Sequence, residues 1–137
     1  MTVEWDAWLA GFIDGEGCIL IDISQYDPSL RIANSAVDAL EKVRSREGGF
    51  IVSIAGKNRP AHWKLGFEWR LASPPAIREL LERVRPYMQV KQKEAWLMLE
   101  YLAQRTVQTN RQPITSGEAA LRHGFRLALQ IAKVKTV

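Results

Sequence analysis

The sequence predicts an α+β fold of order αββαββα, in which a curved antiparallel four-stranded sheet is followed by additional C-terminal helices. Three observations predict it. Apolar residues first recur at helical spacing, as in a helix. From Cys18, apolar and polar side chains alternate, as in a strand. The same order of one helix and two strands is repeated after residue 34. With 137 residues, 47% of them hydrophobic, the chain is expected to be one domain over 1–137. We expect its core at about 1–104 and a C-terminal helical extension at about 105–137.

The first helix is predicted to begin at Thr2 and to end at Gly15 and Gly17. Thr2 can cap the first backbone N–H groups, and Glu4 lies in the first turn, where negative charge is favoured. The glycines and the change of period at Cys18 end the helix. The side chains expected to face the core are Trp5, Leu9 and either Phe12 or Ile13.

A hairpin is expected next, with residues 27–29 as the turn between its strands. The side chains predicted to point inward are Ile19, Ile21, Ile23, Leu30 and Ile32. Those predicted to point outward are Leu20, Asp22, Ser24, Tyr26, Ser29 and Arg31. Either Asn34 or Ser35 is then expected to cap the second helix.

The second half of the chain repeats this order. The second helix presents Val37, Leu40 and Val43 on one side and ends at Gly48-Gly49. Strands are predicted at about 50–55 and 63–71, and the last alternates clearly. Ser73 caps a third helix with the apolar stripe Ile77, Leu80, Leu81 and Val84. Two more helices are predicted at about 89–104 and 116–133, joined by a polar connector.

The composition limits the possible function classes. There are 19 Lys and Arg against 15 Asp and Glu, a net charge of +4, which favours a polyanionic partner. Cys18 is the single cysteine, so no intrachain disulfide forms, and no apolar run is long enough to span a membrane. No signal peptide is visible, so an intracellular, reducing compartment is expected. The isolated His62 and His123 argue against a zinc enzyme.

Polar side chains collect on the outward face of the predicted sheet. An antiparallel sheet can keep one face in water, so such a face needs no function by itself. These side chains are nevertheless of the types that bind phosphates and base edges. The candidate DNA-contacting residues are Leu20, Asp22, Ser24, Tyr26, Ser29, Arg31, Lys57, Arg59, Lys64, Glu68 and Arg70.

Two features of the first helix depart from the expected pattern. Ala7, Gly11 and Gly15 recur at every fourth position, which lets two helix backbones come close together. The alternative is a glycine packed beneath a tryptophan of its own core. Asp14 and Glu16 lie at the helix C-terminus, where the dipole disfavours negative charge.

A divalent cation beyond the helix end would turn this penalty into an attraction. A carboxylate and unpaired backbone carbonyls are ligands suited to Mg²⁺. Glu16 projects past the helix and is the better-placed ligand, whereas Asp14 is expected to be structural. A solvated acidic turn is the alternative.

The residues 9–17, LAGFIDGEG, resemble the signature of the LAGLIDADG homing endonucleases. The resemblance covers most of the chain: LRIANS and FEWRLAS resemble family segments, and RPYMQVKQKEAW resembles Pro-x-Leu-x-x-Lys-x-x-Gln. It implies a site-specific endonuclease that hydrolyses phosphodiester bonds in both strands of a long DNA target. It also implies Mg²⁺ as cofactor, with Mn²⁺ able to substitute and Ca²⁺ supporting binding without cleavage.

The resemblance assigns roles to individual positions. Glu16 matches the catalytic metal-binding acid, which is more often Asp in the family, and Gly15 the neighbour that can offer a carbonyl. Lys91 matches the lysine near the scissile phosphate. Asn34 matches a water-positioning residue, and Ser35 takes that place if the register differs by one.

The signature occurs once, whereas cutting both strands requires two such acids about a dyad. A homodimer on double-stranded DNA is therefore expected, with a pseudo-palindromic target. The helix residues expected at its interface are Ala7, Ala10, Gly11, Asp14 and Gly15.

Two other function classes remain open from the sequence. One is a non-cleaving nucleic-acid-binding protein of the same fold, either an intron RNA maturase or a transcription regulator. The other is a scaffold that binds partners through its five tryptophans, although Trp63 and Trp69 fall on the apolar face of a strand. No membrane partner is expected.

Overall fold

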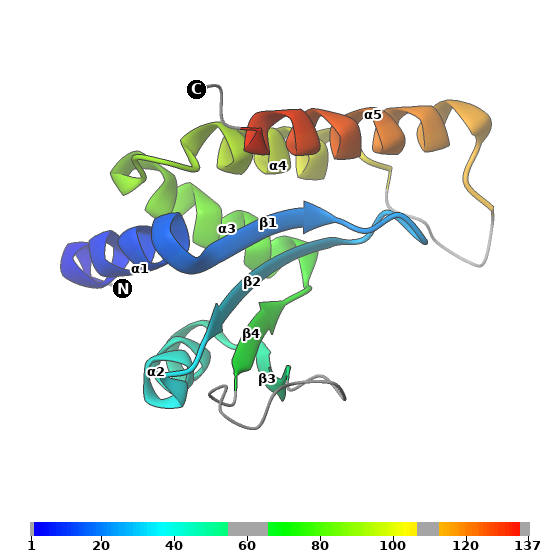
Figure 1. Ribbon diagram of the computed structural model, residues 1–137. Coiled ribbons are helices and arrows are strands. Elements are labelled where there is room, and N and C mark those ends of the chain that lie inside the picture. The colour runs from blue at the N-terminus through cyan, green and yellow to red at the C-terminus, as the bar shows by residue number, and fades with distance from the viewer. Residues whose placement is uncertain (1, 55–65, 107–112, 135–137) are drawn as a thin grey trace.

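The computed structural model describes residues 2–54, 66–106 and 113–134, which form a four-stranded sheet with helices packed against one face (Figure 1). The elements follow the predicted order. They are α1 (Val3–Glu16), β1 (Gly17–Ile21), β2 (Pro28–Asn34), α2 (Val37–Glu47), β3 (Phe50–Ser53), β4 (Phe67–Leu71), α3 (Pro74–Val84), the 3-10 turn η1 (Arg85–Tyr87), α4 (Gln92–Gln104) and α5 (Ser116–Lys133). The predicted fold class is therefore confirmed.

The sheet is antiparallel throughout, with the strand order β1-β2-β4-β3. Gly17 of β1 pairs with Ile32 of β2, and Arg31 of β2 pairs with Arg70 of β4. β1 is therefore one edge of the sheet, and the side chains at 18, 31 and 70 form a row across three strands.

The core lies between the sheet and the helices α1, α2, α3 and α4. Trp69 is fully buried there, and its indole N–H donates to the Gly48 carbonyl oxygen at 2.8 Å, which ties the end of α2 to β4. The buried apolar residues on the strands are Ile19, Ile21, Leu30, Ile32, Trp69 and Leu71. The sheet therefore has one apolar face, as the alternation predicts.

Helix α1 passes directly into β1 because residue 17 is a glycine. The Gly17 backbone N–H donates to the Ile13 carbonyl, and a Cβ at Gly17 would lie 2.7 Å from that oxygen. Thr2 caps the other end of α1, as predicted, by accepting from the Trp5 backbone N–H at 3.1 Å. Leu9 and Ile13 are fully buried, so Ile13 rather than Phe12 completes the core stripe.

The predicted hairpin turn is wrong in position. β1 ends at Ile21, the turn spans residues 22–27, and Pro28 begins β2. The Asp22 carboxylate causes this because it accepts from the backbone N–H groups of Gln25 and Tyr26, which ends the alternation. Ile23 is consequently 63% exposed instead of facing the core.

The helix boundaries also show where local signals are insufficient. Ala36 is the N-cap position of α2, although the Asn34 side chain accepts from the Ala36 backbone N–H at 2.8 Å. Helix α4 begins at Gln92 rather than near residue 89, because η1 and an extended Met88 come before it. The predicted span of α5 is confirmed at Ser116–Lys133. The predicted strand residues 55 and 63–65 lie outside the described residues.

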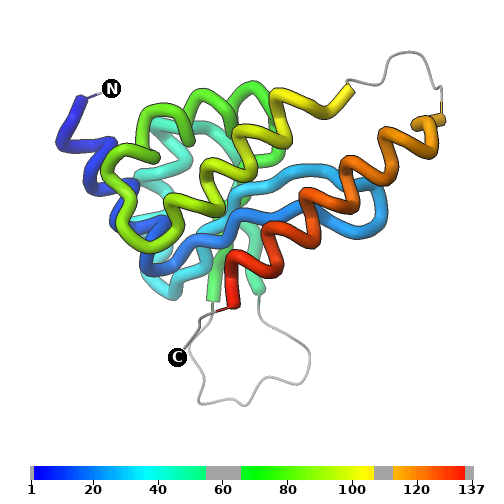
Figure 2. The backbone as a smooth tube through the Cα atoms, turned by 90° about the horizontal axis from the view of Figure 1, so that it is seen from above, coloured from blue at the N-terminus to red at the C-terminus, as the bar shows by residue number. Residues whose placement is uncertain are grey.

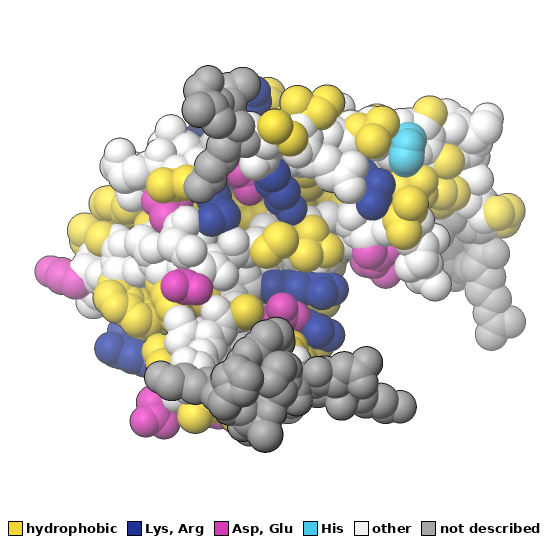
Figure 3. All heavy atoms as spheres, viewed as in Figure 1, with side chains coloured by type: hydrophobic (Ala, Val, Ile, Leu, Met, Phe, Trp, Pro, Cys, Tyr) yellow, Lys and Arg dark blue, Asp and Glu magenta, His cyan; other side chains and the backbone are white. Residues whose placement is uncertain are grey.

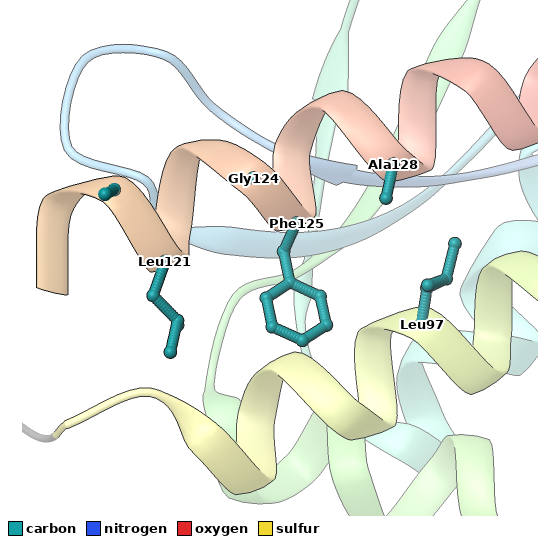
Figure 4. A pocket seen from close by; sticks show the side chains of 6 residues that line it. Leu97, Leu121, Gly124, Phe125 and Ala128 are labelled. Carbon is teal, nitrogen blue, oxygen red and sulfur yellow. The ribbon is translucent and has the colours of Figure 1, made fainter. Parts of the chain in front are cut away.

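Helix α5 lies along α4 and beside the edge strand β1 (Figure 2). Phe125 points from α5 toward α4, where an apolar hollow of about 410 Å³ separates parts of the two helices (Figure 4). The hollow is lined by Leu97, Ala120, Leu121, Gly124, Phe125 and Ala128. No helix among the described residues is long and apolar enough to cross a membrane.

Candidate active site

Glu16 is the last residue of α1 and is exposed. Among the residues that the structure describes, none forms a hydrogen bond or an ion pair with its carboxylate. The residue before it, Gly15, is also exposed. The position therefore leaves an anionic side chain in solvent where the helix dipole already provides partial negative charge.

Asp14, two residues earlier, is held in a different way. Its carboxylate accepts from the backbone N–H groups of Gln89, Val90 and Lys91 at 2.6, 3.2 and 2.9 Å. These groups belong to the segment that leads into α4, whose N-cap is Lys91. Asp14 therefore joins α1 to α4, consistent with the structural role expected for it.

The side chain of Lys91 returns to the end of α1. Its ammonium group donates to the Asp14 backbone carbonyl oxygen at 2.6 Å, and the residue is partly buried. An ammonium group carries three N–H donors, so two remain for other oxygens. The fold thus brings Lys91 to the helix end that carries Glu16, although the two residues are far apart in sequence.

Asn34 ends β2 on the same side of the molecule. Gly17 pairs with Ile32, so Asn34 lies two residues beyond the position opposite the start of β1. Its side-chain oxygen accepts from the Ala36 backbone N–H, which leaves the amide N–H₂ group as its remaining donor. Ser35, the alternative candidate, is exposed in the bend before α2.

The outward face of the sheet carries a charged cluster. Glu68 accepts from Arg70 Nε at 2.5 Å and lies 3.8 Å from Arg31 Nη1. Arg31 Nε also donates to the Ser29 hydroxyl at 3.2 Å. Ser29 is buried, so it holds Arg31 in place instead of presenting a hydroxyl to a ligand. Figure 3 shows Lys and Arg side chains gathered over this face.

The predicted contact residues near the hairpin turn are only partly available. Ser24 is exposed, but its hydroxyl donates to Asp22 Oδ1 at 3.1 Å. Burial raises the pKa of Asp22, but the hydrogen bonds from Gln25, Ser24 and Tyr26 outweigh it and lower the pKa overall. Asp22 thus remains an anion that organises the turn. Leu20 and Tyr26 are partly buried. The predicted contacts Lys57, Arg59 and Lys64 lie outside the described residues.

The predicted small-residue interface on α1 needs one correction. Ala7, Gly11 and Gly15 are exposed, and a Cβ added at Gly11 or Gly15 would meet nothing within 4 Å among the described residues, apart from its chain neighbours and the backbone of its own helix. Ala10 is 0% exposed and lies in the core, so its assignment to the interface is wrong. It is adjacent to Leu9, and the core covers both positions.

The sequence patterns did not identify Glu94. This residue of α4 is 6% exposed, and its Oε2 has no hydrogen-bond partner in the part of the chain that the structure describes. Burial raises the pKa of Glu94, and the nearby ammonium groups of Lys133 and Lys91 oppose this rise without cancelling it. The signal available in the sequence was an acid three residues after the candidate Lys91.

The donor atoms at the end of α1 suit a hard divalent cation but provide only part of its shell. Glu16 contributes carboxylate oxygens, and Gly15 contributes a backbone carbonyl near the helix end. Within 2–54, 66–106 and 113–134, no group of three or more His, Cys, Asp and Glu residues could hold a metal ion. The residues present therefore fit Mg²⁺ as one contribution to its ligand shell, which needs oxygens beyond those of Glu16 and Gly15.

The chain thus combines an acidic helix end with a polar, basic sheet face. Its structural neighbours are LAGLIDADG homing endonucleases. I-CvuI, a homing endonuclease solved in complex with its target, is 21% identical with a TM-score of 0.67, covering 98% of this chain and 87% of that chain.

Two further neighbours have the same fold. I-Vdi141I, an archaeal intron-encoded homing endonuclease complexed with DNA, is 14% identical with a TM-score of 0.60 and covers 90% of this chain and 98% of that chain. I-SmaMI, a LAGLIDADG homing endonuclease bound to cleaved DNA, is 16% identical with a TM-score of 0.64 and covers 94% of this chain and 45% of that chain. No family model matches the sequence, and no curated protein matches it. The likeness thus establishes the LAGLIDADG endonuclease fold.

Proposed function

We propose that this protein is a metal-dependent endonuclease that cuts both strands of a pseudo-palindromic DNA target as a homodimer. The observation that carries the proposal is that two groups meet at the end of α1: an exposed Glu16 without a partner among the described residues, and the Lys91 ammonium group bonded to the Asp14 carbonyl oxygen of the same helix end. A protein that only binds DNA gains nothing from a carboxylate aimed at phosphate, because the two repel each other. A bound divalent cation removes this repulsion.

Glu16 holds Mg²⁺ in this proposal, with the Gly15 carbonyl as a second oxygen. When bound, Mg²⁺ supplies charge stabilisation at the phosphoryl oxygens and an activated water. Lys91 adds a positive charge at the same helix end, and its two remaining N–H donors can bind a phosphoryl oxygen or water. Asn34 offers its amide N–H₂ group to position water. The hydrogen bonds from residues 89–91 to Asp14 keep the end of α1, which carries Glu16, next to Lys91.

The homodimer follows from the number of acids. One Glu16 per chain serves one strand, and the exposed positions Ala7, Gly11 and Gly15 would let α1 pack closely against its copy. A twofold axis through this contact places the two Glu16 carboxylates near each other. Trp8 borders these positions and is 40% exposed, which adds apolar area to the contact.

The outward face of the sheet is the proposed DNA surface. Arg31 and Arg70 share the single carboxylate of Glu68, so the cluster keeps a net positive charge. Guanidinium groups form paired hydrogen bonds with guanine or bind phosphates. The neighbours support this choice of ligand, since I-CvuI and I-Vdi141I were solved with a target or DNA bound.

The test is cleavage of a plasmid library that carries randomised segments of about two helical turns. Wild-type protein is incubated with Mg²⁺, with Ca²⁺ or with a chelator, and the cut ends are sequenced. Linear products of one pseudo-palindromic sequence family with Mg²⁺ alone support the proposal. Mn²⁺ should also support cutting. Strong DNA binding without cutting in Mg²⁺ or Mn²⁺ overturns it in favour of a regulator, and preferential binding of intron RNA favours a maturase.

A further inference from the structure

Helix α5 is placed where it can extend the polar face of the sheet. It lies beside the edge strand β1 (Figures 1 and 2), and Leu129 anchors it at 2% exposure. The sequence did not assign a role to this helix. Because α5 contacts the edge strand β1, one side of this helix faces the core and another faces the outward side of the sheet.

Four polar residues lie along one side of α5. His123, Arg126, Gln130 and Lys133 are spaced by three, four and three residues, which places them on a single helix face. Both ends of this row contact the hairpin. His123 Nδ1 lies 3.2 Å from the Tyr26 hydroxyl, and Lys133 Nζ lies 3.5 Å from Cys18 Sγ. We call these four residues the α5 polar row.

The row meets the outward face of the sheet, not the core face. Ile19 and Ile21 are buried, so Cys18 and Leu20 point to the opposite side. Cys18 is paired with Arg31, and Arg31 is paired with Arg70. The contact of Lys133 with Cys18 therefore continues the cross-strand row of cations onto α5.

A concave surface separates α5 from β1. It has a volume of about 220 Å³ and is lined by Leu20, Ile21, Asp22, Arg126, Leu129, Gln130 and Lys133. Figure 3 shows Lys and Arg side chains both on α5 and on the sheet below it. The fold thus supplies a second basic side to the polar face.

The charges of the α5 polar row are available for an anion. Among the described residues, neither Arg126 nor Lys133 forms a salt bridge, and Asp22 is engaged by its own turn. Glu94 is the other acid near Lys133, and burial raises its pKa, which weakens its competition for the ammonium group. Arg126 and Lys133 are separated by about 10 Å along the helix, close to three base-pair steps of DNA.

We propose that α5 forms a second wall of the DNA-binding surface, with Arg126 and Lys133 binding phosphates beside the segment that the sheet contacts. This inference rests on the proposed function, since it assumes that the sheet face binds duplex DNA. The contacts are to phosphates, because ammonium and guanidinium groups on a helix outside the sheet meet the DNA backbone first. Phosphate contacts carry no sequence information, so they contribute affinity equally to all targets.

The test compares Arg126→Gln and Lys133→Gln with Arg44→Gln. Arg44 lies on α2, which packs against the core face, so its variant removes one charge from the other side of the sheet. Binding to a duplex of arbitrary sequence is measured by fluorescence anisotropy over a series of salt concentrations. Circular dichroism and thermal unfolding confirm that all three variants are folded; Lys133 is exposed at the end of its helix.

Each α5 variant is expected to lower the affinity for duplex DNA about fivefold near 0.15 M salt. The slope of the logarithm of the binding constant against the logarithm of the salt concentration, the salt slope, should become shallower by about 1 for each subunit bound. Arg44→Gln should leave the slope unchanged. Wild-type slopes in both α5 variants overturn the inference while leaving the proposed function intact. Absence of any duplex binding by the wild-type protein overturns both.

Discussion

Two acids at the end of α1 have opposite surroundings. Asp14 accepts three backbone N–H groups from residues 89–91, whereas Glu16 has no partner in the part of the chain that the structure describes. The helix dipole disfavours a negative charge at both positions. The fold compensates the first acid internally and leaves the second for a ligand, so identical side-chain chemistry serves stability at one position and, we propose, catalysis at the other.

The contrast also explains how the site is assembled. Because Asp14 binds the segment that leads into α4, Lys91 reaches the end of α1 with its ammonium group 2.6 Å from the Asp14 carbonyl. The structural acid thus positions a cation for the exposed one.

The substitution Glu16→Gln is expected to have the largest effect, which is on the rate of cleavage. Cleavage should fall at least about 10³-fold, or about 4 kcal/mol in barrier height, because the amide no longer attracts a cation. The free energy of unfolding should stay within about 0.5 kcal/mol of wild type. Initial rates of plasmid cleavage and urea unfolding measure the two quantities. Glu4→Gln, at the other end of α1, is the control for cleavage and should leave the rate unchanged, although loss of its charge near the helix N-terminus lowers stability slightly. Wild-type cutting by Glu16→Gln refutes the assignment.

The next effect concerns Lys91→Met, which keeps the apolar stem and removes the charge. Cleavage should fall about 10²-fold, or about 2.7 kcal/mol, because the developing charge on the phosphate loses its cation. DNA affinity in Ca²⁺ should change little. Single-turnover cleavage and anisotropy separate the two steps, with Lys93→Met as the control. Equal losses in binding and cleavage would assign Lys91 to DNA binding alone.

Asp14→Ala is expected to destabilise the fold by about 2 kcal/mol, because three backbone N–H groups lose their acceptor and exchange it for water. Asp14→Asn retains one acceptor oxygen, so its loss should be smaller. Urea unfolding at constant protein concentration measures both variants. An unchanged midpoint for Asp14→Ala would show that these contacts do not hold α1 to α4.

The smallest effect involves Glu94, a third acid near Lys91. Glu94 is buried, and its Oε2 has no hydrogen-bond partner among the described residues. Burial raises its pKa in the folded state, so the unfolded state loses this proton first as the pH rises above about 4.3. Wild type therefore loses stability with rising pH until the folded-state pKa is passed. Glu94→Gln should remove this loss and be more stable than wild type at neutral pH, with the difference vanishing in acid. Unfolding measured from pH 3 to pH 8 tests this; a difference independent of pH contradicts it.

The sequence predicted those elements whose signals are local. The apolar stripe of α3 and the span of α5 match the structure because each keeps the helical period over a long stretch and begins after a clear start residue. The turn at 22–27 was misplaced because the Asp22 side chain replaces ladder hydrogen bonds with its own, which alternation does not reveal.

The candidate site was predictable only in part. The exposed end of α1 follows from the glycines and the acid pair, but the contacts of Asp14 join residues 75 to 77 positions apart. Ala10 could not be separated from Ala7 by spacing, since small residues on both sides of α1 look alike in sequence. The α5 polar row became recognisable only when the fold placed it beside β1.

The most direct test uses dimers that combine one wild-type subunit with one Glu16→Gln subunit, purified through two different tags and supplied with Mg²⁺ and a plasmid that carries the selected target. The account predicts that such a dimer nicks one strand and relaxes the plasmid without linearising it, while the Glu16→Gln homodimer leaves it supercoiled. Linearisation by the mixed dimer at the wild-type rate would contradict the claim that each Glu16 serves one strand.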